Sequence, residues 1–161
     1  RHLANHDIPV RVIVDSAPEV LDGVAAHQFG ILREMGASVE ADPDGLPRTE
    51  EPVVVDALIG YGLRGDVRMA GRRYIDWMNN RTGTTVSLDV PSGIDATSGE
   101  TRGVSISPDR TITLALPKTG LGSIPGSLYL ADISIPATVY ERLDIEYRNP
   151  FDDRDWIELE T

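Results

Sequence analysis

The sequence contains no cysteine, which excludes disulfide bonds, thiolate metal sites and a cysteine nucleophile. It also lacks any run of 18 apolar residues, so no segment is predicted to span a membrane. Its first residues do not read as a signal peptide. These absences agree with a reducing cytoplasm, which is the localisation we expect.

Basic residues are scarce, and lysine is the scarcest of them. Fifteen Lys and Arg stand against 26 Asp and Glu, which gives a formal net charge of −11, and Lys118 is the one lysine. This charge disfavours binding to nucleic acid or to anionic membranes, so we expect neither as a partner. An acidic, lysine-poor surface suits a halophilic host with a salt-rich cytoplasm. A GC-rich genome would also favour arginine codons.

Several motifs of hydrolases and nucleotide-binding proteins are missing. The three histidines, His2, His6 and His27, show no HxxxH spacing, and Ser92 lies outside any Gly-x-Ser-x-Gly elbow. There is no Walker lysine-serine motif and no complete Gly-x-Gly-x-x-Gly turn. Metal chemistry based on histidine pairs and Ser-His hydrolysis are therefore not expected.

Alternating apolar runs and helical patterns predict an α/β fold. The predicted strands are Val10–Asp15, Ala37–Ala41 (the weakest), Val53–Leu58, Thr84–Val90, Arg110–Leu116 and Leu128–Ile133. Ser16 and Glu19 form a capping box for a first helix, whose apolar residues recur from Val20 to Met35 and which Gly36 ends. A second helix is predicted from about Arg68 to Asn80, with Tyr74, Ile75 and Met78 on its buried face.

The order of these elements is typical of a doubly wound, mostly parallel sheet, a Rossmann-like three-layer sandwich. We predict that residues 1–161 form a single domain, and that the acidic tail at 149–161 lies on the surface or packs loosely. The stretch Pro91–Pro108 has no helical period, and a loop of that length in a compact domain is often functional.

The first unusual strand end is Asp56, which is followed by the turn Gly60-Tyr61-Gly62-Leu63-Arg64-Gly65. A carboxylate at the end of an apolar strand is costly unless it is paired, hydrogen-bonded or bound to a cation. Glycines let the backbone approach a ligand closely and expose amide donors to phosphate. A tight strand-to-helix turn with no ligand is the alternative.

The next two strand ends also carry polar groups. Asp89 and Ser92 in Leu-Asp-Val-Pro-Ser-Gly place a carboxylate and a hydroxyl close together, which suits a hard cation or a sugar hydroxyl. Alternatively, both side chains cap amides of their own loop. Lys118, after Leu114-Ala115-Leu116-Pro117, is interpreted as a phosphate contact or a tuned acid or base. A solvated loop lysine is the alternative.

Taken together, these segments resemble the NAD(P)H-hydrate epimerase family, also called the YjeF N-terminal domain. The resemblance covers nearly the whole chain and rests on the order and spacing of four segments, residues 56–65, 88–95, 113–121 and 126–136. It implies a YjeF N-terminal-like fold and an isomerase that interconverts the R and S forms of hydrated NADH and NADPH, a nicotinamide nucleotide repair reaction.

The resemblance also implies roles for individual residues. Asp56 and Ser92 would bind a potassium ion, and Asp89 would contact the nicotinamide end. Beyond the resemblance, we interpret Asp89 as the catalytic residue that performs acid/base work at the carbinol carbon. The substrate-binding residues would be Gly60, Tyr61, Gly62, Leu63, Arg64, Gly65, Asp66, Asp89 and Lys118. A homodimer is expected, together with a fused or separate ATP- or ADP-dependent dehydratase that acts on the S form.

One departure from the family pattern concerns the beginning of the chain. Family members carry a loop like Gly-x-Gly-Asn-Asn-Gly-Gly-Asp-Gly before the segment that matches Arg1-His2-Leu3-Ala4. We therefore expect an N-terminally incomplete domain, and we expect these 161 residues alone to epimerise slowly or not at all. The competing hypothesis is a catalytically silent YjeF-like scaffold that binds nucleotides or dimerises, although such a scaffold has no need of strand-end carboxylates.

Overall fold

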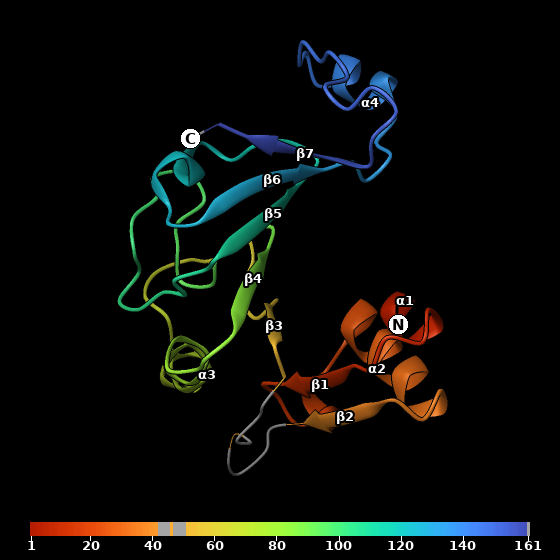
Figure 1. The fold of residues 1–161 in the computed structure, drawn as a ribbon, viewed down its shortest axis with the longest axis vertical. Helices are drawn as coiled ribbons and strands as arrows, with labels where there is room; N and C mark the ends of the chain where they lie inside the picture. Colours follow the sequence, from red (N-terminus) through yellow and green to blue (C-terminus); the bar gives the residue numbers. More distant parts are fainter. Residues whose placement is uncertain (42–45, 47–50, 161) are drawn as a thin grey trace. The chain divides into compact units, whose positions relative to one another are not determined.

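The computed structural model describes residues 1–41, 46 and 51–160, and the chain divides into two compact units, Arg1–Arg48 and Thr49–Thr161 (Figure 1). The first unit contains α1 (His2–Asn5), β1 (Arg11–Val14), the 3₁₀ turn η1 (Pro18–Val20), α2 (Gly23–Glu34) and β2 (Ser38–Ala41). Strands β1 and β2 pair in parallel. Both were predicted, and Gly36 follows α2 at a φ of +71°, as expected for a helix stop.

The predicted start of the first helix is wrong. The Ser16 hydroxyl donates to Asp15 Oδ1 (2.9 Å) and does not cap a helix. The chain makes a separate turn at Pro18–Val20 and then passes through extended backbone at Leu21 and Asp22 before α2 begins. The apolar face was therefore predicted one turn too early, and Val20 is 70% exposed.

The second unit is built on a five-stranded sheet. Its elements are β3 (Val53–Asp56), α3 (Met69–Asn79), β4 (Thr84–Leu88), β5 (Arg110–Leu114), the 3₁₀ turn η2 (Thr119–Ser123), β6 (Ser127–Ala131), α4 (Ala137–Arg142) and β7 (Trp156–Leu159). The strands lie in the order β3-β4-β5-β6-β7, and all neighbours except β6 and β7 are parallel (Figure 1). The predicted α/β class with a mostly parallel sheet is confirmed.

The helix α3 also matches its prediction, with Tyr74, Ile75 and Met78 buried. The C-terminal tail has exposed residues such as Asp152 and Asp153 at the surface. It also adds a strand that was not predicted, because β7 pairs antiparallel with β6, with Leu159 opposite Leu128. Ile157 and Leu159 alternate with glutamates, so an acidic segment still presents apolar side chains on one face of a strand.

The long segment after β4 belongs to the core of the second unit. Val90, Ile94 and Ala96 form one buried cluster with Leu121 and Leu128. Gly93, at a φ of +94°, lies so close to the segment's returning arm that an added Cβ would stand 2.0 Å from the Val104 carbonyl oxygen. The segment therefore folds back on itself and is rigidly packed behind the strand ends. None of the helices in the described ranges has the length and apolar character that crossing a membrane requires.

Candidate active site

Asp56 lies at the end of β3 and is almost completely buried, with 1% of its surface exposed. Its Oδ2 accepts hydrogen bonds from Ser87 Oγ (2.8 Å) and from the Ser92 amide (2.9 Å), and its Oδ1 accepts one from Ser92 Oγ (2.5 Å). Ser87 is the residue directly opposite Asp56 on β4. Two strands and the following loop therefore meet at one buried carboxylate, which has a donor for each oxygen.

Ser92 extends this network to the segment after β3. Its Oγ accepts a hydrogen bond from the Ile59 amide (2.8 Å) and lies 3.2 Å from the Ile59 carbonyl oxygen. Asp56 and Ser92 are therefore in contact, as the resemblance implied. Asp89, which the sequence reading grouped with Ser92, pairs with Lys118 instead. Of the three ways to bury Asp56 that the sequence left open, the structure shows hydrogen bonding, and the result is an oxygen-rich cluster behind the glycine-rich turn.

The next two strands, β4 and β5, end in the same backbone turn. After β4 the Val90 amide donates to the Leu88 carbonyl (2.9 Å), and after β5 the Leu116 amide donates to the Leu114 carbonyl (2.7 Å). The residue between each pair has a positive φ, +67° at Asp89 and +64° at Ala115. Bonds from residue i to i+2 around a positive φ form a rare, strained turn, and such strain is often found at functional sites.

The turn after β4 directs Asp89 toward Lys118. The Lys118 ammonium forms an ion pair with Asp89 Oδ1 and also donates to the Leu114 carbonyl (2.8 Å). Oδ1 accepts two further contacts, from the Leu114 amide (3.1 Å) and from Thr113 Oγ1 (3.4 Å). The other oxygen, Oδ2, accepts no hydrogen bond from the described residues. One oxygen thus holds the carboxylate in place while the other remains available.

Asp89 and Lys118 line a pocket of about 690 Å³ at these strand ends. The other lining residues are mostly apolar or aromatic: Tyr61, Ala96, Thr97, Leu114, Ala115, Leu116, Pro117, Thr119, Ile133, Ile135, Val139, Tyr140, Leu143 and Ile145. The pocket therefore offers one ion pair, without net charge, on a mainly apolar surface. In an open α/β sheet this is the edge where ligands bind.

The glycine-rich turn contributes to the same pocket at one position only. Tyr61 lines it, whereas Gly60, Gly62, Arg64, Gly65 and Asp66 are exposed and Leu63 is half-buried. The turn is anchored at both ends, by the Ile59 amide on Ser92 and by the Val67 amide on the Arg102 carbonyl (3.1 Å). The turn is thus held at both ends, and Tyr61 reaches the pocket.

An ion pair fixes the loop that supports this turn. Asp95 Oδ1 accepts the amides of Thr97 and Ser98, both at 3.0 Å, and Oδ2 accepts Arg102 (2.8 Å). The Ser98 amide, the Arg102 guanidinium and the Thr97 amide hold the pKa of Asp95 well below its usual range. In turn, Asp95 raises the pKa of Arg102. Asp95 therefore acts as a buttress and is not a candidate acid or base.

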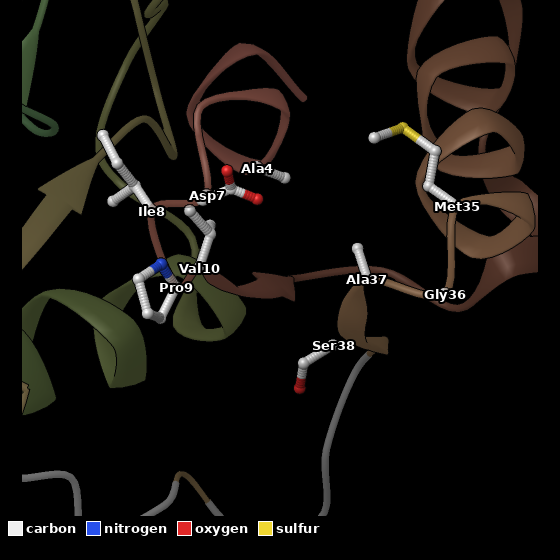
Figure 2. A pocket seen from close by; sticks show the side chains of 9 residues that line it. All are labelled: Ala4, Asp7, Ile8, Pro9, Val10, Met35, Gly36, Ala37 and Ser38. Carbon is white, nitrogen blue, oxygen red and sulfur yellow. The ribbon is translucent and has the colours of Figure 1, made fainter.

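The first unit contains a second, smaller pocket, of about 390 Å³ (Figure 2). Figure 2 shows its walls: Ala4 of α1, residues Asp7 to Val10, which lead toward β1, and residues Met35 to Ser38, which join α2 to β2. Asp7 is its one ionisable side chain. None of the residues predicted to act in a site lies there, so it offers no reactive pair comparable to Asp89 and Lys118.

Sequence reasoning missed the wall of the larger pocket that follows β6. Four apolar side chains of this wall, Ile133, Ile135, Val139 and Leu143, come from the segment that contains α4. The signal in the sequence was their spacing, since apolar residues recur there every two to four positions beside few charges. Ser87, the buried partner of Asp56, was missed as well. The signal was a serine inside an apolar strand, since a buried hydroxyl, like a buried carboxylate, needs a hydrogen-bond partner.

Comparisons with known proteins identify the relatives of this chain. An NAD(P)H-hydrate epimerase from Dehalogenimonas lykanthroporepellens is 41% identical over 94% of this chain and 62% of its own length. A bifunctional NAD(P)H-hydrate repair enzyme from Salinibacter ruber is 37% identical over 88% of this chain and 30% of its own. This chain therefore spans less than two thirds of either relative.

A solved structure and a family profile complete the comparison. The crystal structure of a yeast protein superposes with a TM-score of 0.79 over 98% of this chain and 69% of the yeast chain, at 20% sequence identity, which supports the fold. The family described as YjeF-related protein N-terminus matches residues 1–120. That match includes Asp56, Asp89 and Lys118, and the chain belongs to the YjeF-related N-terminal family.

Proposed function

We propose that this chain supplies the substrate pocket of an epimerase that interconverts the R and S forms of hydrated NADH and NADPH. The observation that carries the proposal is the Asp89–Lys118 ion pair in an otherwise mostly apolar pocket of about 690 Å³. A hydrated nicotinamide ring is neutral and largely apolar, with one reacting hydroxyl at C6. Such a ring matches a pocket without net charge that holds one acid/base pair.

The residues of the pocket divide the work of binding and catalysis. The backbone amides of the glycine-rich turn, residues 60–66, would hold the phosphates of the dinucleotide. Asp89 Oδ2, which accepts no hydrogen bond from the described residues, would face the nicotinamide ring. When the hydroxyl leaves C6, a cationic iminium forms, and a fixed carboxylate beside the ring would stabilise that charge.

Potassium is the cation that we propose for the oxygen cluster around Asp56. Its possible ligands are a carboxylate oxygen of Asp56, the hydroxyl of Ser92 and the Ile59 carbonyl, which lies 3.2 Å from Ser92 Oγ. These are all oxygens, the ligand type that hard cations prefer. When bound, the ion would offset the buried charge of Asp56, while Ser92 would continue to hold the turn after β3.

A dehydratase is the partner that the proposed reaction requires, because epimerisation only delivers hydrate to a repair step. The bifunctional names of several relatives favour an arrangement in which both activities occur in one polypeptide. We propose an S-specific, ATP- or ADP-dependent dehydratase as the consumer of the product, either fused to this domain or separate from it.

The test is a coupled assay of NADPH recovery. Equilibrated hydrate epimers are mixed with an excess of S-specific dehydratase, and the slow phase due to the R form is followed by near-ultraviolet absorbance. The protein is tested in two forms, the 161 residues alone and the same chain with the family's Asn-Asn-Gly-Gly-Asp loop supplied ahead of Arg1. We expect the second form to accelerate the slow phase. An unchanged slow phase with that form would contradict the proposed function.

A further inference from the structure

The structure assigns a second reactive group to the pocket. We propose that Lys118 donates the proton that lets the substrate hydroxyl leave. As a consequence, Asp89 faces a single cation at any time, either the Lys118 ammonium or a cationic nicotinamide ring. This inference rests on the proposed epimerase function and deepens it, because it names both the proton donor and the basis for rejecting the oxidised cofactor.

The contacts of Lys118 favour chemistry over phosphate binding. A lysine ammonium has three hydrogens, and here Asp89 Oδ1 and the Leu114 carbonyl account for two of them. The third is left for the pocket that Lys118 lines. The Lys118 side chain is 16% exposed and that of Asp89 is 22% exposed. A lysine that binds phosphate as a point charge would not be expected to be committed to a carboxylate beside apolar walls.

The step balances in atoms and electrons. The C6–O bond breaks with its electron pair going to oxygen, and the lone pair of the ring nitrogen forms the C=N bond of the iminium. The proton moves from Lys118 Nζ to the departing oxygen, which leaves as water. In the return step water adds to the opposite face of C6, the electron pair returns to the ring nitrogen, and the released proton returns to Nζ.

The net charge of the pocket does not change during this step. Before it, the cation that faces Asp89 is the Lys118 ammonium. After it, Lys118 is neutral and the iminium ring faces the same carboxylate. A cation that forms in place is therefore accommodated. A ring that arrives already cationic, such as the pyridinium of NAD⁺ or NADP⁺, would meet the Lys118 ammonium in a largely apolar site, where an unpaired charge is costly.

The test compares two small rings that carry no phosphate, so that only the ring site is probed. The cationic probe is 1-methylnicotinamide and the neutral probe is 1-methyl-1,4-dihydronicotinamide. Their binding to the 161-residue chain is measured by NMR titration for the wild type, Lys118→Met, Lys118→Arg and the double variant Asp89→Asn/Lys118→Met. Thermal unfolding of each variant verifies that it is folded.

We expect Lys118→Met to bind the cationic ring about tenfold more tightly than the wild type does, since Asp89 then lacks its cation. Lys118→Arg should reject the cationic ring as the wild type does, because arginine stays charged, and the double variant should lose the gain. Affinity for the neutral ring should change much less. In the coupled assay, Lys118→Met and Lys118→Arg should both lose about 10²–10⁴ in rate, because arginine does not give up a proton.

Two results would overturn the proposal. If the wild type and Lys118→Met bind the cationic ring with equal affinity, or if neither binds it detectably, the proposal that the pocket accepts only one cation at a time is wrong. Near-normal epimerisation by Lys118→Arg contradicts the role of Lys118 as proton donor. Either result leaves the proposed function in place as long as the wild type epimerises, whereas a wild type that fails to epimerise overturns the proposed function itself.

Discussion

Two aspartates at the ends of neighbouring parallel strands, Asp56 on β3 and Asp89 just after β4, are in opposite situations. Asp56 is 1% exposed and has hydrogen-bond donors on both carboxylate oxygens. Asp89 is partly exposed, lines the pocket and has all its contacts on one oxygen. A strand-end carboxylate can thus either be buried among the chain's own hydrogen-bond donors, as Asp56 is, or line the substrate pocket with one oxygen unbonded, as Asp89 does.

The largest loss of stability is expected when Asp56 is replaced. Replacing Asp56 by Ala leaves the Ser87 hydroxyl and the Ser92 hydroxyl and amide without their acceptor in a buried site. Hydrogen bonds to a charged group contribute about 1.5–3 kcal/mol each, so we expect a loss of at least 3 kcal/mol in the free energy of unfolding. Urea denaturation measures it. Asp153→Ala, at an exposed aspartate, is the matched control, and an equal, small effect of both variants would show that Asp56 is not a structural anchor.

A smaller effect is expected at the glycine that follows the Asp56 partner Ser92. Gly93→Ala places a Cβ 2.0 Å from the Val104 carbonyl oxygen at a φ of +94°, whereas an added Cβ at Gly122 meets nothing within 4 Å. We expect Gly93→Ala to destabilise the fold by about 2 kcal/mol or more and Gly122→Ala to have little effect. Thermal unfolding of the two variants measures this difference. Similar melting temperatures would mean that the backbone at Gly93 can move away from Val104 and accommodate the added Cβ.

The smallest effect is expected at Asp95, and it should depend on pH. The Ser98 amide and Arg102 lower the pKa of Asp95 in the folded chain, so its stabilising contribution is fully present above the ordinary aspartate pKa of about 3.9 and is lost as the pH falls below it. Asp95→Ala should therefore lower Tm at pH 7 and lower it less in acid. A difference in Tm that grows as the pH falls from 5 to 3 would contradict this assignment.

The sequence predicts much of the fold because local patterns specify it. The apolar runs located β1 to β6, and the periodicity of Tyr74, Ile75 and Met78 located α3. These elements can be located from side-chain periodicity alone. The contact between Asp56 and Ser92 was expected from the resemblance to the family, and the position of the pocket from the rule that ligands bind at the carboxyl edge of the sheet.

What the sequence did not predict depends on contacts between distant residues. Asp89 and Lys118 are 29 positions apart, and their pairing requires the two matching turns after β4 and β5, which no short motif specifies. The strand β7 was hidden because the tail around Trp156 is strongly acidic, so its charge masked the alternation of apolar side chains. The capping box at Ser16 failed because Pro18 begins a separate turn instead of the helix.

The most direct test of the difference between the two aspartates is the epimerisation rate of Asp89→Asn, with the family's N-terminal loop supplied and with unfolding measured on the same sample. Asn keeps the size of the side chain but removes the negative charge that pairs with the Lys118 ammonium and faces the iminium. We predict a rate lower by about 10²–10⁴, because both the charge stabilisation and the placement of the proton donor are lost, with a Tm close to that of the wild type. Near-normal turnover by a folded Asp89→Asn variant would contradict the account, because the carboxylate that faces the pocket would then have no part in the reaction.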